Sequence, residues 1–317
     1  MSILTRAGVG RVGTRHKRPS PFDNETFLGY LLLVPTVAVL AVFLAFPFVY
    51  GVVLSTTSTE VGDEVLGKFV AFANYIFEVS RDGVFRTAFA NTFSYTFYTT
   101  IVKFVLGLSM ALLLNQVFPA QRFVRAALLL PWIIPSVLST LAWRWMFDPT
   151  FSVINWVMNS GLHLPICHGS TTCVNWLGTP NTAMIAMMIV NIWRGTPFYG
   201  IAFLAGLQTI PVDLYEAAKV DGASRWRQFL HITLPLLRPV LLVVILLSTI
   251  LTFADFQLPW VLTRGAPFNS TQLLATWAYT IAIPGNQLSI GAAVSLFLFP
   301  VLTAVIGVVL LLLRRPE

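Results

Sequence analysis

Residues 216–235 read EAAKVDGASRWRQFLHITLP and lie between two long apolar runs, near residues 182–207 and 238–262. The segment holds one Glu, one Asp, one Lys, two Arg and one His, so it is far more polar than its surroundings. A short turn would be enough to join two apolar helices. The composition of this segment therefore indicates an ordered structure that does more than connect its neighbours.

The chain as a whole is much more apolar than a soluble enzyme. Of its 317 residues, 56% are hydrophobic and only 10% are charged, whereas a soluble domain carries about 25% charged residues. Six runs are long enough to cross a bilayer, which takes about 20 apolar residues. They lie near residues 28–55, 88–114, 124–147, 182–207, 238–262 and 287–313. Backbone groups in lipid need internal hydrogen bonds, so we predict an all-α integral membrane protein with six transmembrane helices.

The basic residues alternate between the segments that flank these runs. Thirteen Lys and Arg residues lie in the N-terminal segment, the second and fourth loops and the C-terminal tail, against four in the other loops. The positive-inside rule then places both termini in the cytoplasm. Because membrane topology explains the net charge of +7, we do not expect nucleic acid as a partner. We expect a basic cytoplasmic segment at 1–27, a membrane domain at 28–313 and a cytoplasmic tail at 314–317.

The two cysteines, Cys167 and Cys173, both lie in the loop 148–181, which is predicted to face outward. A disulfide between them is permitted in an oxidising compartment. Two free thiols remain the alternative, because sequence spacing does not establish the required geometry.

Three ionisable residues lie well inside predicted spans: Lys103, Arg194 and Asp255. A charged side chain in the membrane is costly unless it is paired or hydrated, so each is a candidate functional residue. A structural pair, for instance Arg194 with Asp255, is the alternative, and both interpretations stay open.

Catalytic motifs are missing from the sequence. There is no G-x-x-x-x-G-K-[ST] loop, no H-E-x-x-H and no G-x-S-x-G, and the four histidines are scattered. We therefore expect no enzyme activity, no metal site and no cofactor bound by this chain.

The polar segment itself contains the start and stop signals of two short helices. Asp213 and Glu216 form a D-x-x-E pattern that predicts a capping box and a helix over about 214–221. Gly222 follows, where a helix commonly ends in a left-handed residue. Ser224 is a candidate cap for a second helix over 225–231.

Leu234-Pro235 is then predicted to break the chain before the next span. The resulting loop, 208–237, would be a helix–turn–helix in the cytoplasm. Such a pair could lie on the membrane surface or dock into a partner, and the residues alone do not decide between the two.

A spacing match favours the second interpretation. The pattern E-A-A, three residues, G, nine residues, I-x-L-P is met without a gap by Glu216, Ala217, Ala218, Gly222, Ile232, Leu234 and Pro235. It resembles the EAA loop in permease subunits of binding-protein-dependent ABC importers. The resemblance implies a type I importer permease architecture and a coupling helix that docks into a cytoplasmic ATPase. The coupling residues would be Glu216, Ala217, Ala218, Asp221 and Gly222.

Other segments narrow the resemblance to the carbohydrate-type permeases, the group of the maltose importer's larger subunit. They are NYIFEVSRDGVFRTAFANTFSYT (74–96), NIWRGTPF (191–198) and LTRGAPFNSTQLLATWAYTIAI (262–283). The resemblance implies a path for a mono-, di- or oligosaccharide. Carried over position by position, its lining would be Asn191, Arg194, Gly195, Phe198, Ser248, Leu251, Thr252 and Asp255.

Two of these positions depart from the neutral residues of the maltose importer's larger subunit. Arg194 and Asp255 could pair across the site while still bonding sugar hydroxyls. Alternatively, Arg194 could bind an anionic or phosphorylated sugar or polyol derivative.

The resemblance also implies partners. They are a second homologous permease, an ATPase dimer that holds ATP and Mg, an extracytoplasmic binding protein and the lipids of a bacterial inner membrane. An ATP-independent channel or secondary transporter is the alternative class. It predicts inverted repeats, which the sequence does not display, and leaves the polar loop without a role.

Overall fold

The computed structural model describes residues 25–163 and 174–314 of the chain. It divides into two compact units, residues 1–51 and 52–317, and each is described here by itself. Cys167 and Cys173 lie outside the described residues, so the disulfide stays a prediction.

The described part of the first unit is one apolar helical stretch. Helix α1 (Glu25–Leu40) continues through the π-helix η2 (Ala41–Ala45) into α2 (Phe46–Ser55), which runs on into the second unit. Glu25 lies in the first turn, where a negative charge complements the helix dipole. The π-helix lies just before Pro47, a residue that cannot donate a backbone hydrogen bond.

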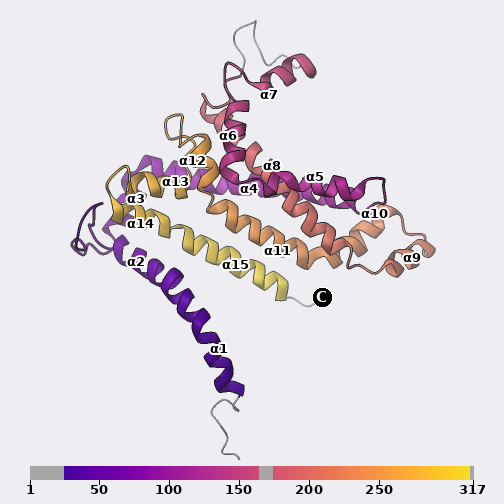
Figure 1. Ribbon diagram of the computed structural model, residues 1–317, viewed down its shortest axis with the longest axis horizontal. Helices are drawn as coiled ribbons and strands as arrows, with labels where there is room; N and C mark the ends of the chain where they lie inside the picture. Colours follow the sequence, from indigo (N-terminus) through magenta and orange to yellow (C-terminus); the bar gives the residue numbers. More distant parts are fainter. Residues whose placement is uncertain (1–24, 164–173, 315–317) are drawn as a thin grey trace, which may run out of the picture. The chain divides into compact units, whose positions relative to one another are not determined.

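Two long helices form the centre of the second unit, α4 (Gly83–Leu114) and α8 (Pro180–Leu207), which pack against each other (Figure 1). Their interface is rich in aromatic and aliphatic side chains. The largest buried cluster there contains Ala111, Leu114, Tyr199, Phe203, Leu207, Leu237 and Leu241. This cluster holds α4, α8 and α11 together beside the candidate site.

The predicted third span, 124–147, is wrong as one straight helix. The chain forms α5 (Gln121–Ile133) and α6 (Ser136–Met146), which are bent by 89° at the break. Pro135 is the cause, because proline disfavours the helical conformation of the residue before it. Ile134 is accordingly extended, with ψ 132°.

The polar loop forms two helices, as predicted, but with two differences. Helix α9 (Val212–Val220) begins at an N-cap of Pro211 and has no side-chain cap, so the predicted Asp213–Glu216 capping box is absent. Asp213 instead lies in the first turn of α9.

The second difference is at Pro235, which does not break the chain. Helix α10 (Arg225–Gln228), the π-helix η4 (Phe229–Thr233) and α11 (Leu234–Phe253) are continuous. The Leu234 amide donates to the Phe229 carbonyl, five residues back. This wider turn lies next to the proline, whose ring would clash with the carbonyl four residues before it in a regular helix.

The predicted fifth span, 238–262, is also interrupted. Helix α11 ends at Phe253, and the separate α12 (Gln257–Leu262) follows after residues 254–256. The remaining helices are α13 (Leu274–Ala282), α14 (Leu288–Leu296) and α15 (Leu298–Arg314), with α13 packed against α14.

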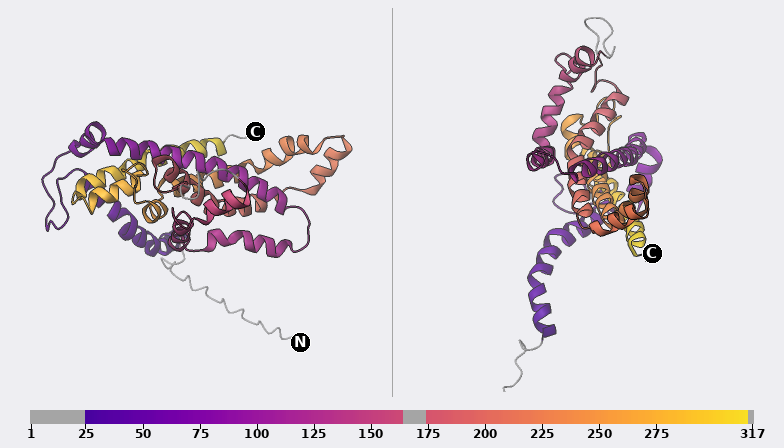
Figure 2. Two further views of the ribbon diagram at one scale, coloured as in Figure 1. Left: turned by 90° about the horizontal axis from the view of Figure 1, so that it is seen from above. Right: turned by 90° about the vertical axis from the view of Figure 1, so that its right-hand side faces the viewer.

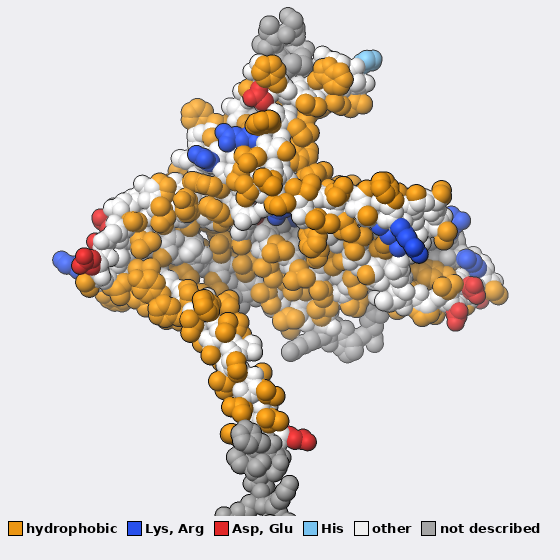
Figure 3. Space-filling view, in the orientation of Figure 1, with side chains coloured by type: hydrophobic (Ala, Val, Ile, Leu, Met, Phe, Trp, Pro, Cys, Tyr) orange, Lys and Arg blue, Asp and Glu red, His pale blue; other side chains and the backbone are white. Residues whose placement is uncertain are grey.

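Short helices connect these elements. They are α3 (Ala73–Arg81), which packs on α14, and α7 (Val153–Trp156) with the π-helix η3 (Val157–Gly161). Figure 2 shows α9 and α10 at one end of the second unit, and α3, α13 and α14 toward the other. Hydrophobic side chains cover most of the face in Figure 3, as expected for helices that face lipid or another apolar subunit.

Four helical stretches of the described chain are long and apolar enough to cross a membrane: Glu25–Ser55, Gly83–Leu114, Arg225–Phe253 and Leu288–Leu313. The bent pair α5–α6 would be a fifth. Helix α8 has the length, but polar residues within it lower its hydropathy, and it is not among them. The all-α class is confirmed, and the count of six spans stays a prediction.

Candidate functional site

A small polar cavity lies where α4, α5, α8 and α11 meet. It has space for about 100 Å³ of solvent. Its lining residues are Lys103, Trp132, Asn191, Arg194, Gly195, Phe198, Ser248, Leu251 and Thr252. Seven of the eight predicted path residues are therefore brought together here, and the eighth, Asp255, is hydrogen-bonded to one of them.

Helix periodicity explains how α8 presents four of these residues. Asn191, Arg194, Gly195 and Phe198 have the spacing i, i+3, i+4 and i+7, which places them on one face of a helix. Asn191 is buried. Phe198 stacks on Trp132 of α5, with ring centroids 6.0 Å apart. The same face thus offers an amide, a guanidinium and an aromatic wall.

Helix α11 contributes the opposite wall with the same spacing. Ser248, Leu251 and Thr252 lie on α11, and Asp255 follows one turn later, just after the helix ends. The carboxylate of Asp255 accepts from the Leu258 amide at 3.4 Å, next to the start of α12. The break between α11 and α12 therefore fixes the position of Asp255. Leu251 is 70% exposed, so the cavity is open on that side.

Lys103 of α4 is the residue that joins the two walls. It is only 2% exposed. Its Nζ atom donates to Asn191 Oδ1 and to Thr252 Oγ1, both at 2.9 Å. A Cβ atom at Gly195 would lie 2.6 Å from Lys103 Cδ, so the absence of a side chain there makes room for the lysine stem.

Lys103 was not among the predicted path residues. The sequence identified Lys103 as an ionisable residue inside a span, but Lys103 lies outside the sequence segments that carried the resemblance to the family. Trp132 carried no comparable signal, since its approach to Phe198 depends on the bend between α5 and α6.

Arg194 and Asp255 do not form the direct pair that was one alternative. No ion pair joins these two described residues. Asp255 Oδ2 instead accepts from Asn191 Nδ2 at 3.3 Å and from the Tyr95 hydroxyl at 3.4 Å. Arg194 Nη1 is buried without a hydrogen-bond partner. Arg194 and Asp255 thus interact through space, without a hydrogen bond between them.

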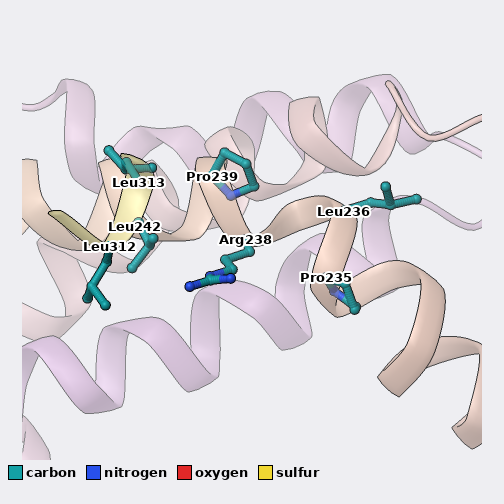
Figure 4. Close-up of a pocket in the computed structure, with 7 residues that line it drawn as sticks. All are labelled: Pro235, Leu236, Arg238, Pro239, Leu242, Leu312 and Leu313. Carbon is teal, nitrogen blue, oxygen red and sulfur yellow. The ribbon is translucent and has the colours of Figure 1, made fainter. Parts of the chain in front are cut away.

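Two other cavities in the described residues have a different character. One of about 250 Å³ lies between α11 and α15, where Arg238 extends toward the side that carries Leu312 (Figure 4). Prolines and leucines form the rest of its lining. A second, of about 440 Å³, is lined almost entirely by apolar side chains of α4, α11 and α15. Neither offers the convergent polar groups of the cavity at Lys103.

The polar loop presents its predicted residues at the surface. Glu216, Ala217, Asp221 and Gly222 are exposed, and Ala218 is partly buried. Gly222 has φ +75°, and the Ala223 amide donates to the Ala218 carbonyl at 2.8 Å. These features confirm the left-handed end of the helix, here as a Schellman motif. Ser224 accepts from the Arg227 amide, which confirms the second cap.

Two side-chain bonds tie α9 and its turn to the long helix that follows. Tyr215 Oη and Thr233 Oγ1 are 2.9 Å apart, and Gln228 Nε2 donates to the Ala223 carbonyl at 2.8 Å. Large apolar side chains nevertheless remain exposed beside them, Val220 at 88% and Trp226 at 68%.

Comparison with known proteins shows the family of the chain. The family described as "Binding-protein-dependent transport system inner membrane component" matches residues 103–316. The trehalose/maltose transport system permease protein MalF of Thermococcus litoralis is 37% identical over 276 residues, which cover 87% of this chain and 90% of that protein. The sulfoquinovosyl glycerol transport system permease protein SmoG of Agrobacterium fabrum is 33% identical over 93% of this chain and 92% of its own.

Among solved structures, a chain of a bacterial ABC transporter involved in the import of the acidic polysaccharide alginate has the same fold. The TM-score is 0.76, with 23% identity, over 91% of this chain and 96% of that one. The family match covers most of the chain, and two relatives exceed 30% identity over nearly all of it. The chain therefore belongs to the inner membrane components of binding-protein-dependent transport systems, the permeases of ABC importers.

Proposed function

We propose that this chain is a permease subunit that forms part of the translocation path for a saccharide and couples it to a separate ATPase through the loop 208–237. The observation that carries the proposal is the cavity at Lys103. It combines amide and hydroxyl groups with the aromatic pair Trp132–Phe198. Hydroxyl-rich rings are bound by this kind of lining, since polar groups bond the hydroxyls and aromatic faces cover the ring.

The relatives support a saccharide as the substrate class. The two relatives described above are named for trehalose/maltose and for sulfoquinovosyl glycerol. A further relative, 29% identical over 98% of this chain, is the diacetylchitobiose uptake system permease protein DasB of Streptomyces coelicolor.

The proposed topology has six spans, with α8 as the fourth, and both termini in the cytoplasm. A polar helix such as α8 is tolerated where it lines a path and its neighbours shield it from lipid. Its buried contacts with α4 and α11 support this placement. The loop 208–237 then lies on the cytoplasmic side, where an ATPase can reach it.

The proposed assembly contains a second permease, an ATPase dimer with ATP and Mg, and an extracytoplasmic binding protein. This chain would supply the path and the docking surface, while ATP hydrolysis belongs to the partner. Because the cavity is open at Leu251, a second subunit would complete its wall.

Co-purification and reconstitution test the proposal. The tagged chain, expressed with the subunits encoded beside it, should purify with an ATPase and take up a saccharide into vesicles only with ATP. Glu216→Lys should lower uptake at least about 10-fold while leaving insertion unchanged, because it reverses a charge on the exposed face of α9. Lys68→Glu, on the opposite predicted side, is the control. Uptake by the chain alone without ATP would instead establish a channel or secondary transporter.

A further inference from the structure

The cavity at Lys103 has an excess of positive charge. Two cations, Lys103 and Arg194, contribute to its lining, and no carboxylate does. The one nearby acid, Asp255, is buried behind the wall and accepts hydrogen bonds from the neutral groups of Asn191, Tyr95 and the Leu258 amide. Its single negative charge offsets one of the two cations.

The hydrogen bonds of the cations leave the excess in place. Lys103 donates to an amide oxygen and a hydroxyl, and lies 6.0 Å from the centre of the Tyr199 ring; none of these is an anion. Arg194 Nη1 is buried and has no partner. Buried charges in proteins are normally paired, so an unpaired guanidinium nitrogen on an arginine that lines a cavity is a feature to be explained.

A negatively charged guest would explain it. Arginine suits a carboxylate or a similar oxyanion because its planar fork can donate two parallel hydrogen bonds. Phe198 lies one turn from Arg194 on the same face of α8 and stacks on Trp132. A sugar ring placed against this aromatic wall would therefore bring an acidic substituent near the guanidinium.

We propose that the substrate is a saccharide carrying one negative charge, such as a uronic acid, and that Arg194 and Lys103 select it over its neutral counterpart. This inference rests on the proposed function and names the substrate class of the same site. Arg194 binds the anionic group, and Lys103 supplies charge while it holds Asn191 and Thr252 in place.

The test measures direct binding to the complete transporter in detergent, without ATP and without the binding protein. The probes are matched pairs of methyl glycosides and methyl uronides of glucose, galactose and mannose, which differ only in the carboxylate. The signal is the part of the tryptophan fluorescence change that Trp132→Phe removes, which assigns it to this cavity. Acetate is the control for a carboxylate without a sugar ring.

At least one uronide should bind about 10-fold or more tightly than its neutral partner, the discrimination expected of one charge-assisted bond. Arg194→Gln and Lys103→Met should each bring the ratio of the uronide and glycoside affinities toward one. Arg194→Lys should keep most of this difference in affinity. Arg264→Gln removes an exposed cation that lies over Trp260, outside this cavity, and should leave the ratio unchanged. Added salt should weaken the binding of the uronides and leave the binding of the glycosides unchanged.

The outcomes separate this inference from the proposed function. Equal or tighter binding of the neutral sugars, or a ratio that survives both Arg194→Gln and Lys103→Met, overturns the charge assignment and leaves the saccharide path standing. Acetate binding as tightly as the uronides shows a simple anion site and also overturns the inference. If neither member of any pair binds, the saccharide path itself is contradicted.

Discussion

Lys103 Nζ lies 2.9 Å from Thr252 Oγ1, which links the middle of α4 to the last turn of α11. The same nitrogen holds Asn191 of α8, so three helices meet at one buried cation. Beyond Thr252 the helix ends, and Asp255 and α12 follow. A movement of α11 would therefore first displace the polar groups of the cavity. This relationship makes the lysine stem, and the glycine beside it, the most sensitive points of the site.

Gly195→Ala should disturb the site without unfolding the protein. The new methyl group would lie 2.6 Å from Lys103 Cδ, so the lysine must shift and its bonds to Asn191 and Thr252 must lengthen. We expect uptake to fall about 10-fold, the equivalent of one lost charge-assisted hydrogen bond, with normal insertion. Initial uptake rates in vesicles measure this.

Gly307→Ala is the matched control for that substitution. Gly307 lies in α15 and has nothing within 4 Å of the position of a Cβ atom, so the change should leave uptake intact. Full uptake by Gly195→Ala would show that Lys103 need not occupy its observed position.

Glu78 of α3 should make the stability of the protein depend on pH. It is 1% exposed, and burial, together with the nearby charge of Asp82, raises the pKa of its carboxyl from 4.5 to about 7. The folded protein therefore holds this proton more tightly than the unfolded chain. Stability should be highest below about pH 4.5 and fall as the pH rises to about 7, where the folded protein must bury the charge. Thermal unfolding across this range measures the trend.

Glu78→Gln should flatten this part of the profile and raise the unfolding temperature at pH 8, because the amide needs no proton to stay neutral. Glu64→Gln is the control, since Glu64 is exposed. An unchanged pH profile in Glu78→Gln would assign the dependence to other groups.

Gly222 should tolerate asparagine better than valine. Its φ of +75° is unfavourable for a side chain, and nothing lies within 4 Å of a new Cβ atom, so backbone conformation alone decides the outcome. A left-handed residue costs about 1–2 kcal/mol when it carries a Cβ atom, least for Asn and most for β-branched residues. Gly222→Val should therefore reduce ATP-coupled uptake more than Gly222→Asn.

The measurement is uptake per ATP hydrolysed by the reconstituted complex. Equal coupling in the valine and asparagine variants would mean that the turn between α9 and α10 does not have to keep its shape.

Much of the candidate site could be predicted because the resemblance to carbohydrate-type permeases carried its residues over position by position. The spacing 191, 194, 195, 198 and its repeat at 248, 251, 252, 255 place the residues on single faces, and the two faces do meet. The Gly222 and Ser224 caps were predicted because glycine and serine are typical of helix ends. Tertiary effects were not accessible from the sequence. These include the break at 254–256, the continuous helix through Pro235 and the position of Lys103 between two walls.

The bond between Tyr215 and Thr233 leads to the last prediction. It ties the exposed helix α9 to the start of the long helix α11, with the two oxygens 2.9 Å apart. Tyr215→Phe removes a bond worth about 1 kcal/mol and keeps the ring in place. If α9 passes motion to α11 through this contact, uptake per ATP should fall while ATP hydrolysis persists. Thr233→Val should act alike, and the double variant should be no worse than either, because both remove one interaction. Tyr98→Phe, at an exposed ring on α4, is the control. Additive losses in the double variant would show that the two hydroxyls act separately and that coupling runs through the backbone of the turn instead.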